Sequence, residues 1–163
     1  MSPVIRPAQP TDSGLIFSLV RELAEYEKLS DEVVATEASI AAALFAREPR
    51  VFCDVAEWNG EPAGFTTWFL NFSTFRGRHG IFLEDVFVRP KFRKQGIGRA
   101  LLRRLAARCI DEGYALFEWA VLDWNEPALS FYRALGAEIM PEWKICRLSG
   151  QALRGFAGKK GDA

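Results

Sequence analysis

One stretch of the sequence, residues 83–98, constrains the fold more than any other. It begins with apolar residues interrupted by Glu84 and Asp85, continues through a basic loop, and reaches Gly96 and Gly98 just before an apolar-periodic segment. This order predicts a buried strand, a loop, and a helix whose first turn lacks bulky side chains. The first N–H groups of a helix have no partner within it, and the helix dipole places positive charge there. We therefore expect this loop to bind a phosphate-bearing ligand.

The remaining sequence alternates between strand and helix patterns, with turn signals between them. We expect strands over residues 3–7, 51–58, 62–72, 81–88, 115–121 and 143–148, and helices over residues 12–28, 36–48, 96–112 and 125–135. Asn59-Gly60 predicts a tight hairpin turn, and residues 73–80 predict a polar loop that holds His79. An antiparallel meander followed by strand, helix and strand predicts an α/β fold with a mixed sheet and helices on both faces.

The length and composition of the chain suit one domain. The 163 residues are 49% hydrophobic, which is ordinary for a globular chain and sufficient to bury a substantial core. We expect a single domain over residues 1–163. Residues 155–163 are rich in Gly and Lys, so we expect them to form a flexible tail.

Charge and cysteine usage exclude several classes of protein. Lys+Arg and Asp+Glu both number 21, whereas nucleic-acid binders are usually basic, so we expect no nucleic-acid partner. No apolar run reaches the roughly 18 residues of a membrane span, and no secretion signal is apparent, so we expect a cytoplasmic protein with no membrane partner. Cys53, Cys109 and Cys146 show neither disulfide nor metal-ligand spacing. We expect three buried reduced thiols and no metal site.

The glycine loop departs from two common phosphate-binding motifs. A Rossmann site needs a third glycine, and a P-loop needs Gly-Lys-Ser/Thr; neither is present at the required spacing. The basic residues Arg93, Lys94 and Arg99 suit a pyrophosphate, and the strand end at residues 86–88 offers backbone groups to an amide-bearing arm. Coenzyme A has both parts. Alone, the glycines also fit a turn that only allows tight helix packing.

Several motifs resemble one enzyme superfamily. Residues 88–98 resemble the acetyl-CoA-binding segment of the GCN5-related N-acetyltransferases (GNAT). Further stretches resemble the diamine acetyltransferase subfamily, which includes spermidine/spermine acetyltransferase, and are nearest to its thialysine acetyltransferase branch: residues 22–30, 83–85, 121–127, 131–132 and 135–137. The resemblance covers roughly residues 4–148 in family order. It implies the GNAT fold, with a twisted, mostly antiparallel central sheet.

The resemblance implies that the chain binds acetyl-CoA. The implied cofactor contacts are Val86, Phe87, Val88, Arg93, Lys94, Gln95, Gly96, Ile97, Gly98, Arg99, Asn125, Pro127 and Tyr132. The first three would bind the pantetheine arm through their backbone, and residues 93–99 would hold the pyrophosphate. Tyr132 would lie beside the thioester sulfur.

The resemblance also implies acetyl transfer to the primary amine of a small cationic substrate. The implied acceptor contacts are Tyr26, Glu27, Ser73, Phe75, Glu84 and Asp85. An alkylamine titrates near about 10, so it must lose a proton before it attacks a thioester. Glu84 is the candidate base, directly or through a water, and Tyr132 is the candidate acid for the leaving thiolate.

Other interpretations of these residues stay open. Glu84 and Asp85 are neighbours on a strand, so they point to opposite faces unless a bulge intervenes. Either carboxylate also fits a solvated or salt-bridged position, and Tyr132 also fits a core aromatic residue. The segment after Ala137 is shorter than in the family, so the role of Glu142 is open.

The sequence says less about the identity of the amine acceptor than about the acetyl-CoA donor. The chain has Ser73-Thr74-Phe75 where the polyamine enzymes carry Asp-Pro-Trp, which removes one anchor for a long polycation. A thialysine- or lysine-like amine or a diamine is the leading substrate class. A protein or peptide amine, and a catalytically inactive CoA-binding module, are the alternatives. The resemblance implies a homodimer whose acceptor site draws on both subunits.

Overall fold

A five-stranded sheet organises the first part of the chain. The computed structural model describes residues 2–159. Its strands are β1 (Val4–Pro7), β2 (Phe52–Trp58), β3 (Glu61–Ser73), β4 (Arg78–Val88) and β5 (Phe117–Trp119). They lie in sequence order, with β1 to β4 antiparallel and β5 parallel to β4. The predicted mixed, mostly antiparallel sheet is thus confirmed.

The helices α1 to α4 begin within one residue of the predicted positions. They are α1 (Ser13–Tyr26), α2 (Glu37–Leu44), α3 (Ile97–Asp111), α4 (Glu126–Ala134) and α5 (Gly150–Phe156), with short 3-10 turns at Pro10–Asp12, Ser30–Glu32 and Pro90–Phe92. The hydroxyl of Thr36 accepts a hydrogen bond from the backbone N–H of Ser39 at 3.1 Å and so begins α2. The side chain of Asn125 accepts one from the N–H of Ala128 at 3.3 Å at the start of α4. Both are the caps expected of these residue types.

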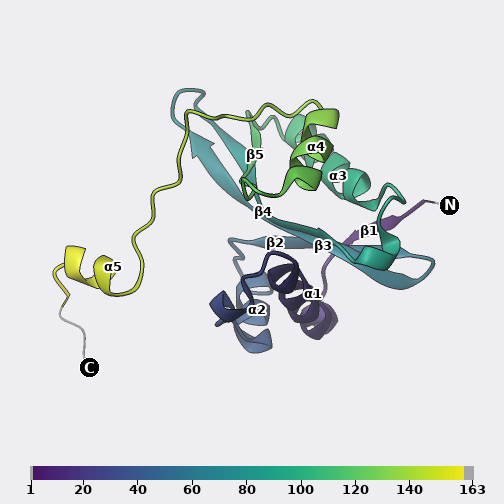
Figure 1. Cartoon of the computed structure of the whole chain (residues 1–163), viewed down its shortest axis with the longest axis horizontal. Helices are drawn as coiled ribbons and strands as arrows, with labels where there is room; N and C mark the ends of the chain where they lie inside the picture. Colours follow the sequence, from purple (N-terminus) through teal and green to yellow (C-terminus); the bar gives the residue numbers. More distant parts are fainter. Residues whose placement is uncertain (1, 160–163) are drawn as a thin grey trace. The chain divides into compact units, whose positions relative to one another are not determined.

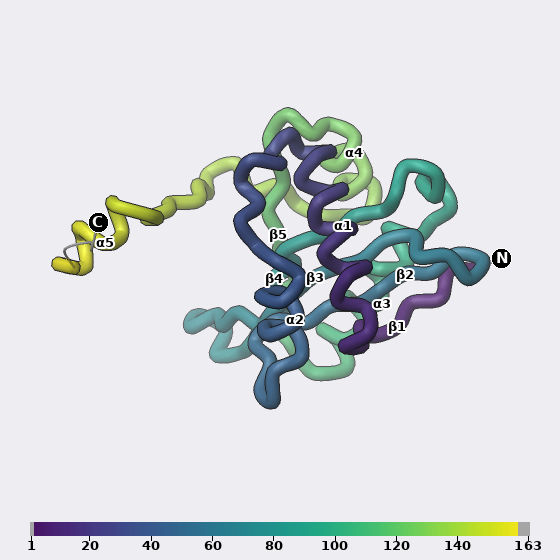
Figure 2. Tube along the Cα trace, turned by 90° about the horizontal axis from the view of Figure 1, so that it is seen from below, coloured from purple at the N-terminus to yellow at the C-terminus, as the bar shows by residue number. Residues whose placement is uncertain are grey.

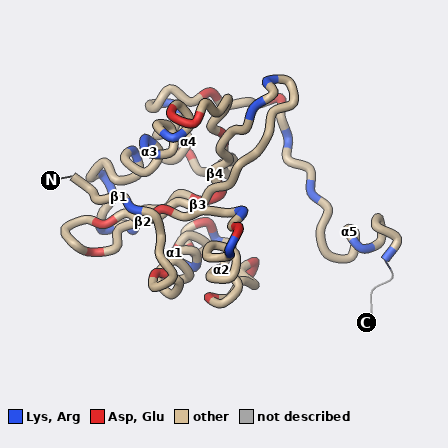
Figure 3. The backbone as a smooth tube through the Cα atoms, turned by 180° about the vertical axis from the view of Figure 1, so that it is seen from behind, with Lys and Arg blue, Asp and Glu red and all other residues tan. Residues whose placement is uncertain are grey.

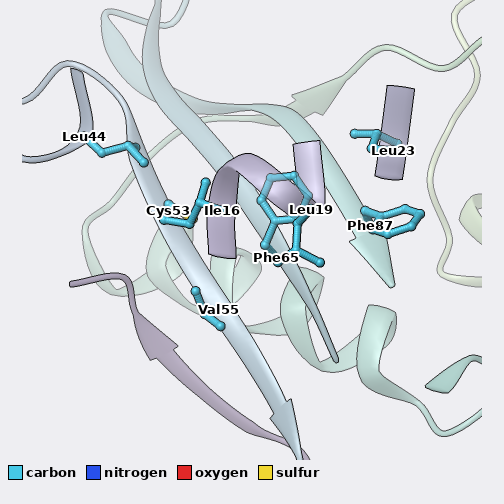
Figure 4. Close-up of a cluster of buried hydrophobic side chains, with 8 residues drawn as sticks. All are labelled: Ile16, Leu19, Leu23, Leu44, Cys53, Val55, Phe65 and Phe87. Carbon is cyan, nitrogen blue, oxygen red and sulfur yellow. The ribbon is translucent and has the colours of Figure 1, made fainter. Parts of the chain in front are cut away.

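Helices cover both faces of the sheet. Figure 1 shows α1 and α2 on one face and α3 on the other, and Figure 2 shows α1 and α2 side by side. On the first face, α1 packs a cluster that is drawn in Figure 4: Ile16, Leu19, Leu23, Leu44, Cys53, Val55, Phe65 and Phe87. On the opposite face, Ile97 and Leu101 of α3 pack against Ala56 and Ala63. Because successive strand residues point to opposite faces, Val55 and Ala56 belong to different cores.

An ion pair between a buried carboxylate and a partly exposed arginine ties α3 to the sheet. The carboxylate of Asp54 in β2 is buried and accepts hydrogen bonds from Arg104 Nε at 3.0 Å and from Trp68 Nε1 at 3.2 Å. Arg108, one turn further along α3, lies over the Trp68 ring at 5.0 Å from its centre. Figure 3 shows further basic residues along this helix. Asp54 is therefore satisfied by two donors, as a buried carboxylate requires.

The hairpin between β3 and β4 is tighter than predicted. We expected a loop over residues 73–80, but β4 begins at Arg78 and only residues 74–77 form the turn. Gly80, which suggested a turn, is needed inside the strand. A Cβ at Gly80 would lie 2.6 Å from Asn71 Oδ1 and 2.7 Å from Leu116 O. Glycine in a strand often marks such a close approach of another backbone. His79 is exposed as expected, but it lies on the strand.

The chain divides into two compact units, Met1–Ala120 and Val121–Ala163. The second unit contains α4 and α5. The predicted strand at residues 143–148 is wrong, because no strand of the described residues pairs with it and a strand needs a partner. The helix α5 was not predicted; its residues 151–154 are good helix formers. Gly155 and Phe156 of the predicted tail belong to α5, and residues 160–163 lie outside the described residues.

Two of the three cysteines are buried, as expected, and one is not. Cys53 and Cys109 are buried free thiols, whereas Cys146 is exposed, in a segment without regular secondary structure. No helix of the described residues is both long and apolar enough to cross a membrane.

We predict that Gly64→Ala destabilises the fold by about 1–3 kcal/mol, the usual cost of forcing extra atoms into a packed core. A Cβ at Gly64 would lie 2.3 Å from the carbonyl oxygen of Phe87 and 3.1 Å from the Cα of Val88, and backbone atoms cannot rotate away. Urea unfolding measures the change. Gly155→Ala, in open space within α5, is the matched control and should leave the free energy of unfolding unchanged or slightly raised. Equal stability of the two variants would contradict the steric argument.

Candidate functional site

One edge of β4 has no strand beside it from Glu84 onward. The parallel strand β5 pairs only with Ile81, Phe82 and Leu83, and no other strand within residues 2–159 continues along that edge. On the β3 side, the N–H of Arg89 donates to Ala63 O at 2.9 Å. Backbone groups alternate in direction along an antiparallel strand. The open edge therefore presents the backbone of Val86 and Val88.

A β-bulge at Glu84 sets the direction of the residues that follow it. Thr67 of β3 pairs with Asp85 and Trp68 pairs with Leu83, so Glu84 has no partner in the register. The extra residue shifts the alternation of the strand by one. Asp85 and Phe87 consequently share the face that α1 covers, whereas Leu83 points to the α3 face. This resolves the alternative that the sequence left open: Glu84 is exposed and Asp85 is half-buried.

Asp85 and Glu27 form an acidic slot at the C-terminal end of α1. The hydroxyl of Thr67 donates a hydrogen bond to the Asp85 carboxylate. Burial raises the pKa of Asp85 above its usual range, and the charge of Glu84 raises it further, against the lowering effect of Thr67. Burial also raises the pKa of Glu27, and the charge of Asp85 adds to that shift. Two carboxylates that repel each other in a partly desolvated site favour a cation between them.

The start of α3 is open to an anion. Gly96 precedes the helix with φ 78°, and no side chain caps the helix start. The first backbone bond of the helix runs from the N–H of Ala100 to Gly96 O at 2.9 Å. Lys94 also adopts a positive φ, 64°, which curls the loop. A Cβ at Gly96 would meet nothing within 4 Å, so the space on that side of Gly96 is open. The arrangement fits a diphosphate.

The remaining predicted residues of this loop divide between the core and the surface. Ile97 is buried against Leu101 and Phe92, whereas Gln95 and Arg99 are exposed. Phe87 also belongs to the core, and its carbonyl oxygen points at Gly64 of β3. Among residues 86–88, backbone groups directed away from β3 are therefore those of Val86 and Val88.

The side chain of Arg93 lies against Tyr26, at the C-terminal end of α1. Its Nε donates a hydrogen bond to Val88 O at 3.0 Å. Its guanidinium carbon lies 4.7 Å from the centre of the Tyr26 ring and 5.8 Å from that of Phe87. Tyr26 is the last residue of α1 and directly precedes Glu27. The structure thus brings together Tyr26, Glu27 and the loop after β4.

Sequence reasoning missed Arg89, which fixes α1 in this place. Its Nη2 and Nε donate to the Glu22 carboxylate at 2.7 and 2.9 Å, and its Nη1 donates to Pro62 O at 3.0 Å. Glu22 lies one turn before Tyr26 on α1. No local pattern in the sequence connects residues 22 and 89, so no signal identified this pair. Thr67 was missed for the same reason, since its role depends on the register of the bulge.

Ser73 and Phe75 lie at the other end of the β3–β4 hairpin. Ser73 is six residues from Thr67 along β3, a distance of about 20 Å in a strand. Phe75 is fully exposed in the turn, and the neighbouring Phe72 is half-exposed. The structure therefore does not bring these two residues to the acidic slot within one chain.

The predicted residues of the second unit lie on or before α4. Asn125 caps the helix, and Pro127 lies in its first turn. Tyr132 lies further along α4 and is buried. The centre of its ring lies 5.5 Å from the centre of the Phe131 ring. Glu142 is exposed and lies outside any helix or strand.

An open strand edge, a helix start without a capping side chain and a pair of neighbouring carboxylates are features that suit a phosphate-bearing donor and a cationic acceptor. The chain matches the model of the Acetyltransferase (GNAT) family over residues 16–137. It belongs to that family, and it is an acetyl-transferring enzyme. Enzymes of this family use acetyl-CoA.

Named relatives span nearly the whole chain. The thialysine N-epsilon-acetyltransferase of Bos taurus is 42% identical over 96% of this chain and 98% of its own length. The L-ornithine N5-acetyltransferase NATA1 of Arabidopsis thaliana is 30% identical over 92% of this chain and 86% of its own length.

Solved structures share the fold. An integron cassette protein from the mobile metagenome of V. cholerae superposes with a TM-score of 0.79 at 25% identity, covering 96% of this chain and 98% of the other. An aminoglycoside acetyltransferase from an uncultured soil sample superposes with a TM-score of 0.75 at 16% identity, covering 90% and 97%. The GNAT fold expected from the sequence is confirmed.

We predict that Asp85→Asn stabilises the protein at pH 7.5 while lowering its activity. The raised pKa means that ionised Asp85 opposes folding at neutral pH, whereas the protonated form does not. The melting temperature should rise by about 2–4 °C. The gain should shrink as the pH falls through the raised pKa and should vanish well below the ordinary aspartate value of 3.8, where the carboxyl is protonated in both the folded and the unfolded state. Thermal melts at several pH values measure this. Asp31→Asn, at an exposed aspartate, is the control and should change neither. A gain that persists at low pH would contradict the electrostatic cause.

Proposed function

We propose that the protein transfers the acetyl group of acetyl-CoA to the primary amine of a small cationic substrate, a thialysine- or lysine-like amine or a diamine. One observation carries the proposal: the bulge at Glu84 directs Asp85 toward Glu27 beside an open strand edge. The slot is acidic and suits an ammonium group. The names of the relatives support the substrate class, since they act on thialysine and ornithine.

The donor site consists mainly of backbone groups. Val86 offers its N–H and C=O groups and Val88 offers its N–H group to the amide-bearing arm, while the Val88 carbonyl accepts a hydrogen bond from Arg93. The diphosphate binds at the start of α3, through residues Lys94, Gln95, Gly96, Ile97, Gly98 and Arg99. Arg93 begins this segment, with its guanidinium held at Val88 and Tyr26. Asn125, Pro127 and Tyr132 complete the proposed donor set, as the family resemblance implies.

The three carboxylates have different roles toward the acceptor amine. Glu27 and Asp85 bind and orient the ammonium group, and the hydroxyl of Thr67 fixes the Asp85 carboxylate. Glu84, exposed at the bulge, accepts the proton that the amine must lose, directly or through a water. Bound acetyl-CoA supplies an activated acetyl thioester. The phenol of Tyr132 is the proton donor to the departing sulfur.

The alternatives have less support. The acidic slot places two carboxylates beside each other, which suits a single ammonium group. The relatives that align over most of the chain are named as acetyltransferases of small amines, so a peptide acetyltransferase or an inactive CoA-binding module is not favoured.

The protein is proposed to act as a cytoplasmic homodimer. The fully exposed Phe75 and the half-exposed Phe72 at the tip of the β3–β4 hairpin support an interface with a second copy. In such a dimer Ser73 and Phe75 would serve the acceptor site of the partner, which accounts for their distance from Asp85 within one chain. The balanced charge of the chain offers no support for a nucleic-acid partner.

An amine panel tests the proposed function. We expect the purified protein to consume acetyl-CoA with thialysine, lysine, ornithine or short diamines, measured by release of the free thiol. Gly96→Asp should raise the KM for acetyl-CoA more than tenfold over Gly96→Asn. Both residues tolerate the positive φ, but only aspartate places a negative charge where the diphosphate binds. Turnover with none of these amines would refute the assignment.

The role of Tyr132 has its own test. We expect Tyr132→Phe to lower kcat by about 10² to 10⁴, the usual contribution of a general acid, with little change in acetyl-CoA affinity. Isothermal titration with CoA and steady-state rates separate the two effects. Phe131→Leu, at the neighbouring aromatic residue, is the control. An unchanged kcat in Tyr132→Phe would remove the phenol from the mechanism.

A further inference from the structure

Two neighbouring threonines of β3, Thr66 and Thr67, are both buried but differ in their hydrogen bonding. The hydroxyl of Thr67 donates a hydrogen bond to the carboxylate of Asp85. The hydroxyl of Thr66 is fully buried and has no hydrogen-bond partner among the described residues. Successive residues of a strand point to opposite faces of the sheet, so only one of these two hydroxyls lies on the side of Asp85.

The register of the sheet places Thr67 directly beside Asp85. Cys53 of β2 pairs with Thr67, and Thr67 pairs with Asp85, so the three side chains form a row across three strands. Side chains paired in this way share one face of the sheet. Figure 4 shows Cys53 and Phe65, which lies two residues before Thr67, in the core on the face that α1 covers. The hydroxyl is therefore held in place by regular strands and not by a loop.

The hydroxyl of Thr67 favours the ionised form of Asp85. Within residues 2–159, this carboxylate is the hydrogen-bond partner of the hydroxyl, because the neighbouring thiol of Cys53 is directed to the carbonyl oxygen of Asp54 at 3.8 Å. A β-branched side chain has few rotamers in a strand, so the hydroxyl keeps its direction. A hydrogen bond to an ionised acceptor is roughly twice as strong as one between neutral groups. The contact is therefore stronger when Asp85 is charged.

The other groups around Asp85 oppose its charge. Burial raises the pKa of Asp85 most, and the charge of Glu84 raises it further, whereas the hydroxyl of Thr67 lowers it. From α1, Glu27 repels the same charge. From β2, the thiol of Cys53 is neutral, because burial raises its pKa. No Lys or Arg of the described residues forms an ion pair with Asp85.

We propose that Thr67 is a positioning residue for the acetyl transfer: its hydroxyl holds Asp85 in the ionised form that binds the ammonium group of the acceptor. Thr67 thereby sets the lowest pH at which the acceptor binds. A protonated Asp85 has no charge for an ammonium group, and its O–H faces a group that is itself only a donor. The proposal rests on the proposed function, in which Asp85 and Glu27 bind the amine, and adds the pH dependence of that binding.

The two threonines provide matched variants for the test. Thr67→Val removes the hydroxyl and keeps the shape of the side chain, and Thr67→Ser restores a hydroxyl. Thr66→Val makes the same change on the opposite face of the sheet. At saturating acetyl-CoA, kcat/KM for lysine and for ornithine is measured between pH 5.5 and 9. The amine titrates identically with every variant, so the ratio of variant to wild type reports the groups of the protein.

We expect Thr67→Val to lose activity progressively as the pH falls. Its acidic limb should lie about one to two pH units above that of the wild type, which is the equivalent of one hydrogen bond to a charged group. Thr67→Ser should restore most of the wild-type profile, and Thr66→Val should not shift it. A ratio of Thr67→Val to wild type that stays constant with pH would overturn the proposal, because a packing defect lowers the rate equally at every pH.

Thermal melts provide a readout that does not need turnover. Ionised Asp85 opposes folding, and loss of the Thr67 hydrogen bond increases that opposition only at a pH where the carboxyl is ionised. Thr67→Val should therefore lower the Tm more at pH 7.5 than at pH 3, which is below the ordinary aspartate pKa of 3.8. In the Asp85→Asn background this dependence on pH should disappear. An equal change in Tm at both pH values would contradict the proposed role of the hydroxyl.

Failure of this proposal can be told apart from failure of the proposed function. A wild-type protein that acetylates no amine would refute the function itself. Normal turnover with an unshifted acidic limb in Thr67→Val would refute only the role of Thr67. If Thr67→Val does not fold, Thr67→Ala takes its place, with Thr66→Ala as its control.

Discussion

The register shift at Glu84 is the constraint on which the site depends. Without the extra residue, Asp85 would face α3 and the carboxylate slot with Glu27 would not form. With it, the strand presents Leu83 to one core and Phe87 to the other, so the same bulge serves both packing and chemistry. Bulges commonly redirect side chains next to functional sites, and here the redirected residue is a carboxylate whose burial raises its pKa.

Holding two carboxylates close together in a partly desolvated place opposes folding, so other contacts must compensate. The α1 helix supplies much of that through Ile16, Leu19 and Leu23, which are buried against the sheet. Arg89 adds a bidentate ion pair that is partly shielded from solvent. An exposed ion pair contributes little to stability, but this one fixes an angle and a position for α1. The position of Glu27 relative to Asp85 therefore depends both on the packing of α1 and on the connection after β4.

Local patterns in the sequence predicted most of the elements. Turn and helix-start signals depend only on residues close by in the sequence. The structure confirms the turn at Asn59-Gly60 and the helix starts at Thr36, Gly96 and Asn125. Contacts between distant residues were not accessible in this way. The register of β3 against β4 decides which way Asp85 points, and the partner of Arg89 is 67 residues away. Gly80 shows the limit clearly, because its glycine signal was read as a turn when the cause was a backbone from elsewhere in the chain.

The unpaired edge of β4 has a consequence beyond ligand binding. Unpaired N–H and C=O groups that can bind an amide-bearing molecule can also pair with a β-strand of another polypeptide. Such edge-to-edge pairing is a common cause of aggregation. Here the vulnerable run is short: the protruding Glu84 interrupts it at one end, and Pro90, which lacks an N–H, closes it at the other. The unpaired edge of β4 is therefore short, and a strand from another chain would form few hydrogen bonds with it.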